Sequence, residues 1–463
     1  MTSTFTLINP ATAQPVGEVA RAGVAEVDDA VARAVAAQRS WAALPPVARA
    51  DALRAFARAV EARVEELAQL EVAESGHPIG SARWEASHVA QVLNFYAGAP
   101  ERLSGQQIPV AGGLDVTIHE PYGVVGIIVP WNFPMTIASW GFAPALAAGN
   151  AVVLKPAELT PLTALRLGEL ALEAGLPPGL FQVITGSGSV VGQRFVSHPD
   201  VRKVVFTGST SVGTDVAAGC ARELKPVTLE LGGKSANVVF ADADLEKAAA
   251  SAPGAVFDNA GQDCCARSRI LVQRSVYDRF LELLEPAVQA WRVGDPADEA
   301  TEMGPLISAS HRSTVEEFLD GANVAFRGSA PLAGDPALGG GFWLAPTVVL
   351  ADRGDRIARE EVFGPVVAVL PFDDEADAIR LANDTIYGLA GSIWTENLGR
   401  AVRVARGVKS GVLSVNSHSS VRYWTPFGGM KASGLGRELG PDAAEHFTET
   451  KNVFFATDAD PAR

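Results

Sequence analysis

A long uncharged stretch constrains this chain more than any other feature, because from Tyr122 to Leu154 no side chain carries a charge. That length exceeds the roughly 20 residues that a membrane-spanning helix needs. Prolines and asparagines interrupt it, at Pro130, Asn132, Pro134, Pro144 and Asn150. Its first part, Gly-Val-Val-Gly-Ile-Ile-Val, is rich in β-branched residues, which favour strands. The stretch therefore predicts a buried strand, a loop, a helix and a second strand, and not a membrane span.

The same alternation of strand and helix continues along the chain. Apolar runs of a first series predict strands at 124–129, 151–155, 181–185, 203–207, 227–231 and 237–240. A second series predicts strands at 269–273, 348–350, 366–371 and 411–416. Helical patterns lie between them, at 164–174, 213–223, 276–291, 375–383 and 397–404. Such alternation indicates βαβ units, so we expect two α/β domains with parallel sheets and helices on both faces.

The two ends of the chain predict further elements. Valines four residues apart predict an amphipathic helix at 24–41, and a second, longer helix is expected at 48–75. Residues 107–110 and 115–119 flank a Gly-Gly turn and predict a hairpin. The alternating tail at 448–455 could add a strand to that hairpin or pair with a neighbouring subunit.

Composition excludes several classes of function. The 463-residue chain has a formal net charge of −15 and a pI near 5.0, which disfavours binding to nucleic acid or to an anionic membrane. Its three cysteines form no disulfide framework, and no spacing of cysteine and histidine suggests a metal site. The first residues lack the pattern of a secretory signal, so we expect a cytoplasmic location.

Two of the three cysteines, Cys264 and Cys265, lie side by side after Gly261-Gln262-Asp263. A cysteine attacks as the thiolate, and a glycine close before it leaves room for a substrate carbonyl. Free cysteines are most often small core residues, and both of these could be that. A catalytic Cys264 would also need an oxyanion donor, a hydride acceptor and a base for water. The chain offers a candidate for each.

Two motifs follow predicted strands, where open parallel sheets bind their ligands. Phe-Thr-Gly-Ser-Thr-Ser-Val-Gly at 206–213 opens a helix whose N-terminus could receive a phosphate, although a tight turn explains it equally well. Lys155 and Glu158 end another strand. A glutamate there can accept both ribose hydroxyls of adenosine and would repel a 2′-phosphate. A solvated ion pair is the alternative.

Two other side chains could serve the chemistry itself. Asn132, in Pro-Trp-Asn-Phe-Pro, has a neutral amide that can donate to a developing oxyanion. Glu230, in Leu-Glu-Leu-Gly-Gly-Lys-Ser, ends an apolar strand, where burial should raise the pKa of its carboxyl group and suit it as a general base. The alternative is a structural glutamate that accepts hydrogen bonds from backbone amides.

Together these motifs resemble the NAD(P)-dependent aldehyde dehydrogenase superfamily over nearly the whole chain. Pro-Trp-Asn-Phe-Pro, Lys-Pro-Ala-Glu, Phe-Thr-Gly-Ser-Thr, Leu-Glu-Leu-Gly-Gly-Lys-Ser and Gly-Gln-Asp-Cys occur in the order of that family. Glu-Glu-Val-Phe-Gly-Pro at 360–365 and Pro-Phe-Gly-Gly-Met-Lys-Ala-Ser-Gly at 426–434 follow them. Each motif is weak alone, and the seven in order are specific.

The resemblance implies an α/β fold in three parts. A Rossmann-type parallel-sheet domain for NAD is expected at 1–103 and 122–232, and an α/β catalytic domain at 233–445. A small β oligomerisation element is expected at 104–121 and 446–463. The family likeness implies a homodimer or homotetramer.

The resemblance also implies a role for each candidate residue. Cys264 matches the nucleophile, Glu230 the general base and Asn132 the oxyanion donor, whereas Cys265 is read as packing and Glu438 as a supporting acid. The positions that match cofactor contacts are Val129, Pro130, Trp131, Lys155, Glu158, Gly188, Gly192, Gly208, Ser209, Val212, Leu231, Glu361 and Phe363. The implied reaction oxidises an aldehyde to a carboxylic acid through a cysteine thiohemiacetal and thioester, with NAD in preference to NADP.

The substrate is the least constrained part of the prediction. The resemblance puts Phe133, Trp140, Phe427 and Asp258 near the aldehyde, and Asp263 is adjacent in sequence to Cys264. Aromatic and acidic side chains suit a cationic tail, so we expect an aminoaldehyde such as 4-aminobutyraldehyde, as in the aminobutyraldehyde and betaine-aldehyde branch.

Several alternatives stay open. Arg267 or Arg422 could bind the carboxylate of a semialdehyde, and both aspartates could simply bind local backbone amides. A broad-specificity dehydrogenase, a coenzyme A-acylating enzyme and a non-catalytic protein of the same fold are the others.

Overall fold

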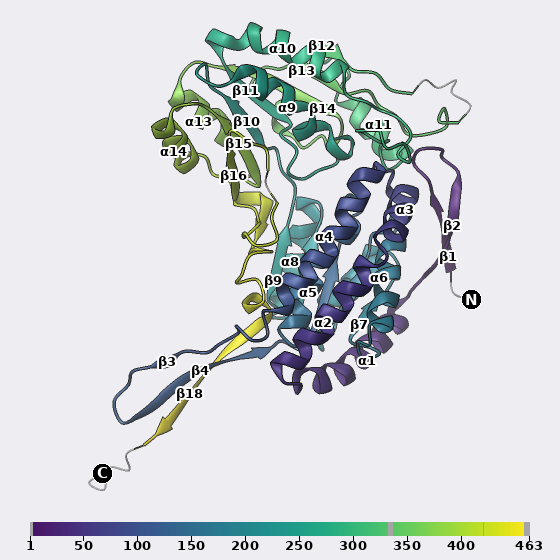
Figure 1. The fold of residues 1–463 in the computed structure, drawn as a ribbon, viewed down its shortest axis with the longest axis vertical. Helices are drawn as coiled ribbons and strands as arrows, with labels where there is room; N and C mark the ends of the chain where they lie inside the picture. The colour runs from purple at the N-terminus through teal and green to yellow at the C-terminus, as the bar shows by residue number, and fades with distance from the viewer. Residues whose placement is uncertain (1–2, 332–336, 420, 458–463) are drawn as a thin grey trace.

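Two bodies, each built around its own sheet, make up the molecule, and a long arm projects from it (Figure 1). The computed structural model describes residues 3–331, 337–419 and 421–457. The two sheets lie in two separate hydrophobic cores, one in each body. The chain therefore has the α/β fold that the sequence predicts.

The first body holds a six-stranded sheet of order β17-β9-β8-β5-β6-β7. Its strands are β5 (Val124–Ile128), β6 (Ala151–Lys155), β7 (Phe181–Val183), β8 (Val201–Thr207), β9 (Val227–Glu230) and β17 (Gly434–Leu435). All neighbouring strands run parallel except β17 and β9. β5, β6 and the helix α5 (Pro134–Ala147) between them are buried along their whole length, so the uncharged stretch folds as predicted.

Helices cover both faces of this sheet, as expected. Gly126 of β5 faces Phe195 of α7 (Gln193–Ser197), and the next residue, Ile127, faces Gly141 of α5. Successive strand residues point to opposite faces, so the two helices lie on opposite sides. The other helices of this body are α1 (Val24–Ala42), α2 (Pro46–Glu61), α3 (Val64–Ser75), α4 (Ile79–Ala97), α6 (Leu162–Glu173) and α8 (Thr210–Arg222).

The prediction of a single helix at 48–75 is wrong, because two helices occupy this range. α2 ends at Glu61, and Arg63 has non-helical φ and ψ of −125° and 19° before α3 begins at Val64. The junction contains neither proline nor glycine, so the sequence carries no local signal for the break. Packing explains it, because both α2 and α3 lie against α4 and α6 and must turn to do so.

The second body holds a seven-stranded sheet of order β12-β13-β14-β11-β10-β15-β16. Its strands are β10 (Ala236–Val239), β11 (Arg269–Gln273), β12 (Val324–Arg327), β13 (Thr347–Leu350), β14 (Val366–Phe372), β15 (Ala390–Trp394) and β16 (Val412–Val415). The sequence pattern put β10 with the first series, which is wrong, because β10 pairs with β11 and β15. The helices are α9 (Leu245–Phe257), α10 (Tyr277–Gln289), α11 (Ala309–Glu317), α12 (Arg356–Arg359), α13 (Glu375–Asn383) and α14 (Leu398–Gly407).

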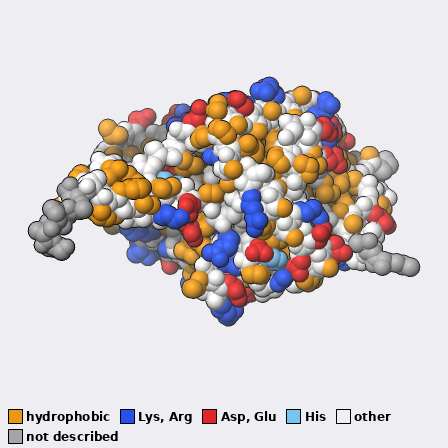
Figure 2. Space-filling model, turned by 90° about the horizontal axis from the view of Figure 1, so that it is seen from below, with side chains coloured by type: hydrophobic (Ala, Val, Ile, Leu, Met, Phe, Trp, Pro, Cys, Tyr) orange, Lys and Arg blue, Asp and Glu red, His pale blue; other side chains and the backbone are white. Residues whose placement is uncertain are grey.

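Three strands form the arm: β3 (Gln107–Ile108), β4 (Gly113–Pro121) and β18 (Thr448–Ala456). β18 pairs antiparallel with β4 from Thr448 opposite Pro121 to Ala456 opposite Gly113. The tail therefore completes the hairpin within the same chain, one of the two predicted outcomes. Hydrophobic side chains gather on the arm where it extends from the body (Figure 2).

The chain begins with two paired antiparallel strands, β1 (Ser3–Ile8) and β2 (Pro15–Arg21). The sequence analysis did not predict this ribbon. The proposed division between residues 232 and 233 falls between β9 and β10, whereas β17 returns to the first sheet. Residues 1–2, 332–336, 420 and 458–463 of the proposed ranges lie outside the described residues. No helix in the described part of the chain has the length and hydropathy needed to cross a bilayer.

Candidate active site

A pocket of about 250 Å³ brings the three predicted catalytic residues together. Asn132 follows β5, Glu230 ends β9, and Cys264 comes from the loop after α9. Residues from the carboxyl ends of the first sheet and from the second body complete the lining, namely Pro130, Trp131, Ile137, Thr207, Gly208, Ser209, Leu231, Gly232, Glu361 and Phe363. Side chains far apart in the sequence thus meet at the carboxyl ends of the parallel strands, where open α/β sheets bind their ligands.

A strained loop presents Cys264. Asn259 and Ala260 have positive φ of 48° and 54°, and Gly261 has a φ of 72°. Left-handed backbone is costly for residues other than glycine, and it persists where the surroundings fix it. Gln262 provides that support, since its Oε1 accepts from the Ile307 amide at 2.9 Å and its Nε2 donates to the Asn259 carbonyl at 3.0 Å.

The surroundings of Cys264 favour its protonated thiol. A hydrogen bond with the Cys265 thiol, followed by burial, raises the pKa of Cys264 well above its ordinary value. The two sulfurs and an oxygen of Asp263 lie within 4.8 Å of one another. Attack on a carbonyl therefore requires that the thiol proton be taken up as the new bond forms.

The amide of Asn132 is oriented by the same loop. Its Nδ2 donates to the Gln262 carbonyl at 2.9 Å, and Asn259 Nδ2 donates to the Asn132 carbonyl at 2.7 Å. An amide group has two N–H donors, so one remains for an oxyanion in the pocket. Asn259 and Gln262 are positioning residues that the sequence analysis did not assign. Both residues lie in the motif Asn-Ala-Gly-Gln-Asp-Cys together with Cys264, and this proximity in sequence could have indicated their role.

Glu230 has the properties of a poised base. It is buried, and neither carboxylate oxygen makes a hydrogen bond of ordinary geometry in the described part of the chain, although the Gly429 amide lies close enough to lower its pKa in part. Burial, and then the Glu438 carboxylate, raises the pKa of Glu230 well above its ordinary value. The alternative of a glutamate saturated by backbone amides is therefore not observed.

The predicted cofactor residues surround the ends of β5, β6 and β8. Val129 N donates to the Lys155 carbonyl at 3.1 Å, and Gly192 packs beside Lys155. A Cβ on Gly208 would lie 2.7 Å from the Phe206 ring, so glycine keeps the turn after β8 compact. Ser209 caps α8 by accepting from the amide of Val212 at 3.4 Å. Gly188 begins the short helix η1 (Gly188–Gly192) beside this edge.

Glu361 and Phe363 close the pocket from the second body. Glu361 Oε1 accepts from the Gly233 amide at 2.8 Å, and burial raises the pKa of Glu361 to about 7. Phe363 has a positive φ of 56°, and its ring meets that of Trp131 at 5.3 Å. His311 of α11 donates to the Phe363 carbonyl at 2.7 Å. The sequence analysis missed His311, because only the tertiary fold brings α11 to this site.

A second pocket, of about 590 Å³, opens beside Cys265. Asp258, Asp263 and Arg267 line it, together with Lys247. Asp263 accepts from the Cys265 amide at 2.8 Å, and Asp258 accepts from the Asn259 amide at 3.0 Å, so both aspartates make the local contacts that were the alternative reading. They nevertheless face the pocket. Asp258 is exposed, so its carboxyl group is open to this pocket.

Comparisons with known proteins agree over this whole arrangement. The family model described as "Aldehyde dehydrogenase family" matches residues 1–453. The chain belongs to the aldehyde dehydrogenase family. An aldehyde dehydrogenase of Emericella nidulans is 42% identical over 461 residues, which cover 98% of this chain and 92% of that protein.

Two solved structures are similar to this dehydrogenase. PnpE from Pseudomonas sp. WBC-3 is 42% identical with a TM-score of 0.96, covering 100% of this chain and 96% of PnpE. Betaine aldehyde dehydrogenase from Staphylococcus aureus is 37% identical with a TM-score of 0.96, covering 99% of this chain and 93% of that one. Both have been solved with NAD bound. The present chain is accordingly an aldehyde oxidoreductase.

The two arginines considered for substrate binding differ in their surroundings in this dehydrogenase. Arg267 is buried and donates to Ser392 Oγ at 3.0 Å, to the Cys265 carbonyl at 2.5 Å and to the His418 carbonyl at 3.2 Å. Its guanidinium therefore holds the catalytic loop on the second sheet. Arg422 is exposed and is not part of the lining of the 590 Å³ pocket.

The three predicted aromatic residues of the dehydrogenase lie outside both pocket linings. Trp140 packs on Phe427 at 5.1 Å and donates to His88 Nε2 at 3.2 Å, and Phe133 packs on His77 at 5.3 Å. The cluster continues through His88 to the rings of Trp84 and Tyr423, which the sequence analysis did not single out.

A buried network lies behind Phe133 in the dehydrogenase. His77 Nδ1 is 2.5 Å from Glu85 Oε1 and 3.5 Å from Glu71 Oε1, and Thr136 donates to Glu85 Oε2 at 3.1 Å. Thr136 is in the first turn of α5, and this helix begins directly after Asn132 and Phe133. The network therefore fixes the start of α5 and, with it, the oxyanion donor.

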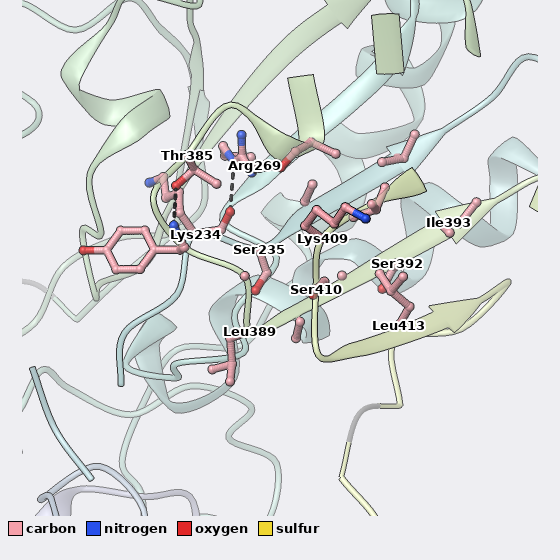
Figure 3. A pocket seen from close by; sticks show the side chains of 18 residues that line it. Lys234, Ser235, Arg269, Thr385, Leu389, Ser392, Ile393, Lys409, Ser410 and Leu413 are labelled. Atoms are coloured by element: carbon pink, nitrogen blue, oxygen red, sulfur yellow. Dashed lines mark hydrogen bonds between the residues drawn. The ribbon is translucent and has the colours of Figure 1, made fainter. Parts of the chain in front are cut away.

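The turn after Glu230 is fixed to the second body. Arg269 Nε donates to the Lys234 carbonyl at 2.9 Å (Figure 3). Its other nitrogens donate to the carbonyls of Leu381 and Ala382, both at 3.0 Å. The cavity between these groups offers only about 10 Å³, room for about one water molecule. Arg269 of β11, through the Lys234 carbonyl, thus anchors the base-bearing turn of the dehydrogenase.

Proposed function

We propose that this enzyme oxidises an aminoaldehyde, such as 4-aminobutyraldehyde, to the carboxylic acid. The observation that supports the choice of substrate is the pair of carboxyl groups, Asp258 and Asp263, on the wall of the 590 Å³ pocket beside Cys265. An aldehyde whose tail lay in this pocket would sit beside Cys265, the sequence neighbour of Cys264. A cationic tail is attracted by such a wall.

The chain's own residues perform the steps around the hydride transfer. Cys264 Sγ forms a bond to the aldehyde carbon and gives up its proton to a water molecule, and the free N–H of Asn132 donates to the oxygen that becomes negative. NAD, when bound, accepts the hydride that leaves this carbon. Glu230 then takes a proton from water, which attacks the thioester and releases Cys264 and the acid.

The residues of the 250 Å³ pocket fit a nicotinamide cofactor. Gly208 and Gly232 leave backbone open to it, and Glu361 offers a carboxylate for a ribose. We propose the remaining cofactor positions as predicted from the sequence, with Glu158 at the adenosine ribose and NAD preferred over NADP. A cytoplasmic location remains part of this proposal.

A semialdehyde with a carboxylate tail is the second candidate. Lys247 and Arg267 also line the 590 Å³ pocket and favour a negative tail. The hydrogen bonds of Arg267 to backbone carbonyls argue against it, because those donors are already used.

Initial rates of NADH formation test the proposal. We expect 4-aminobutyraldehyde and betaine aldehyde to exceed succinate semialdehyde and hexanal in kcat/KM, without any requirement for coenzyme A. Asp258→Asn should raise the KM for 4-aminobutyraldehyde about tenfold and leave hexanal nearly unchanged. A wide preference for succinate semialdehyde would refute the aminoaldehyde, and a requirement for coenzyme A would refute hydrolysis.

A further inference from the structure

An arginine from the N-terminal ribbon lies at the proposed adenosine site. Arg21 is the last residue of β2, and its Nε donates to Oε1 of Glu158 at 2.9 Å. Its Nη2 is 2.8 Å from the same oxygen. The guanidinium thus occupies one oxygen of this carboxylate, and the second oxygen remains for a ligand.

The fold holds Arg21 at the carboxyl edge of the first sheet. The Ala22 amide donates to the Thr185 carbonyl at 2.9 Å, and Thr185 Oγ1 donates to the Ala20 carbonyl at 2.6 Å. These bonds tie both neighbours of Arg21 to the end of β7, beside β6 and Glu158. The guanidinium also lies 5.2 Å from the centre of the Phe5 ring.

Stability does not account for this placement. The side chains of Arg21 and Glu158 are 42% and 31% exposed, and ion pairs with that exposure contribute little to folding. Lys155, another cation at this edge, is buried and donates to the Pro156 carbonyl at 2.6 Å. Arg21 is an accessible cation next to the carboxylate that would meet the ribose.

We propose that Arg21 sets how well the enzyme uses NADP relative to NAD. This inference rests on the proposed function, in which Glu158 accepts the ribose hydroxyls. A 2′-phosphate would be repelled by Glu158, whereas a guanidinium binds phosphate with paired hydrogen bonds. Arg21 moves from Glu158 to the phosphate when NADP is bound, so the enzyme prefers NAD and still accepts NADP.

Kinetics of four proteins test the inference: wild type, Arg21→Ala, Glu158→Gln and the double variant. Arg21→Ala should lower kcat/KM for NADP about tenfold and change that for NAD much less, because a hydrogen bond to a charged group has this strength. Glu158→Gln should raise kcat/KM for NADP, since it removes the repulsion and frees Arg21. The double variant should lose that gain.

Binding provides a readout that does not depend on turnover. Calorimetry with adenosine 2′,5′-bisphosphate and with AMP should give weaker binding of the bisphosphate alone in Arg21→Ala. Arg21→Lys retains the charge and should keep part of the bisphosphate affinity. This variant also serves if Arg21→Ala folds poorly.

Arg33→Ala is the matched control. Arg33 is an exposed arginine of α1 that donates to Asp29 and to Gln182 and makes no contact with Glu158. This variant should keep the wild-type ratio of the two cofactors. Equal losses with NAD and NADP in Arg21→Ala, or bisphosphate binding that does not change, would overturn the inference. Absence of NADH formation with every aldehyde would instead overturn the proposed function.

Discussion

The two adjacent thiols face different pockets, and this separates their roles. Cys264 lines the 250 Å³ pocket with Glu230, whereas Cys265 lines the 590 Å³ pocket with the aspartates. Cys264→Ser should reduce turnover by about a thousandfold or more, because a serine hydroxyl in that position is a far weaker nucleophile. Cys265→Ser should keep most of the activity. NADH formation measures both, and the opposite ranking would move the nucleophile to Cys265.

The raised pKa of Glu230 predicts a pH effect on one step of the reaction. The base must be ionised to activate water, so acid release should slow as pH falls through the pKa of Glu230. Glu230→Gln should retain a first burst of NADH and then stall, since no base remains for the thioester. Stopped-flow absorbance separates the burst from the steady state. A variant that loses the burst as well would show that Glu230 acts before hydride transfer.

The same carboxyl group predicts a pH dependence of stability. Its pKa in the folded state is raised, so its favourable effect is full below the unfolded pKa and is lost as pH rises through the folded pKa. Glu230→Gln should therefore melt at a higher temperature than wild type at about pH 9 and show less difference at about pH 5. Melting curves at the two pH values provide the check.

Single residues were predictable where a motif names them. Asn132, Glu230 and Cys264 lie in short contiguous motifs, and the fold brings them to one pocket. His311 and Arg21 were missed, because each reaches the site from an element that is distant in sequence and contains no motif. For Asp258 and Asp263 the sequence could predict only the local hydrogen bonds of their loop. It could not predict the pocket that they line, because the tertiary fold forms that pocket.

At the scale of elements, the turn after β9 joins the two bodies through a glycine. A Cβ on Gly232 would overlap Oε2 of Glu361, the carboxylate that the Gly233 amide holds at 2.8 Å. Gly232→Ala should displace Glu361 and raise the KM for NAD about tenfold, with a smaller effect on kcat.

Gly80→Ala is the control for that change. Nothing lies within 4 Å of a Cβ at Gly80, which is in α4, so alanine there should leave the KM for NAD unaltered. Alanine should also stabilise the helix by about 1 kcal/mol. Steady-state kinetics with varied NAD distinguish the two variants, and a wild-type KM in Gly232→Ala would exclude Glu361 from cofactor binding.

Strands and helices with a strong hydrophobic pattern in their own sequence were predictable. Strands that form only because they pair with other strands of the folded sheet were not. β5, β6 and α13 match expectation closely, because apolar runs or helical spacing define them. β15 is fully buried but was missed, since Ala-Gly-Ser-Ile-Trp has little β-branched character. Strand membership also depends on tertiary pairing, and for this reason β10 was grouped with the wrong sheet.

At the scale of the whole molecule, the arm leaves apolar side chains in solvent. Phe454 and Phe455 of β18 are 50% and 52% exposed, and Ile118 of β4 is 44% exposed. A three-stranded sheet with no covering layer is poorly stable alone, and an exposed apolar surface of this kind is typical of a subunit interface. We therefore expect a homodimer or homotetramer in which the arm packs on another subunit.

Charges on the arm should disrupt that assembly. Phe454→Glu with Phe455→Glu would bury carboxylates in the expected interface, so sedimentation at micromolar concentration should give a smaller mass than wild type. Leu224→Glu is the matched control, because Leu224 is 91% exposed on the body and should leave the mass unchanged. A wild-type protein that sediments as a monomer would exclude the interface. An unchanged mass in the double variant would place the contact elsewhere, because two buried carboxylates facing a partner subunit could not leave it intact.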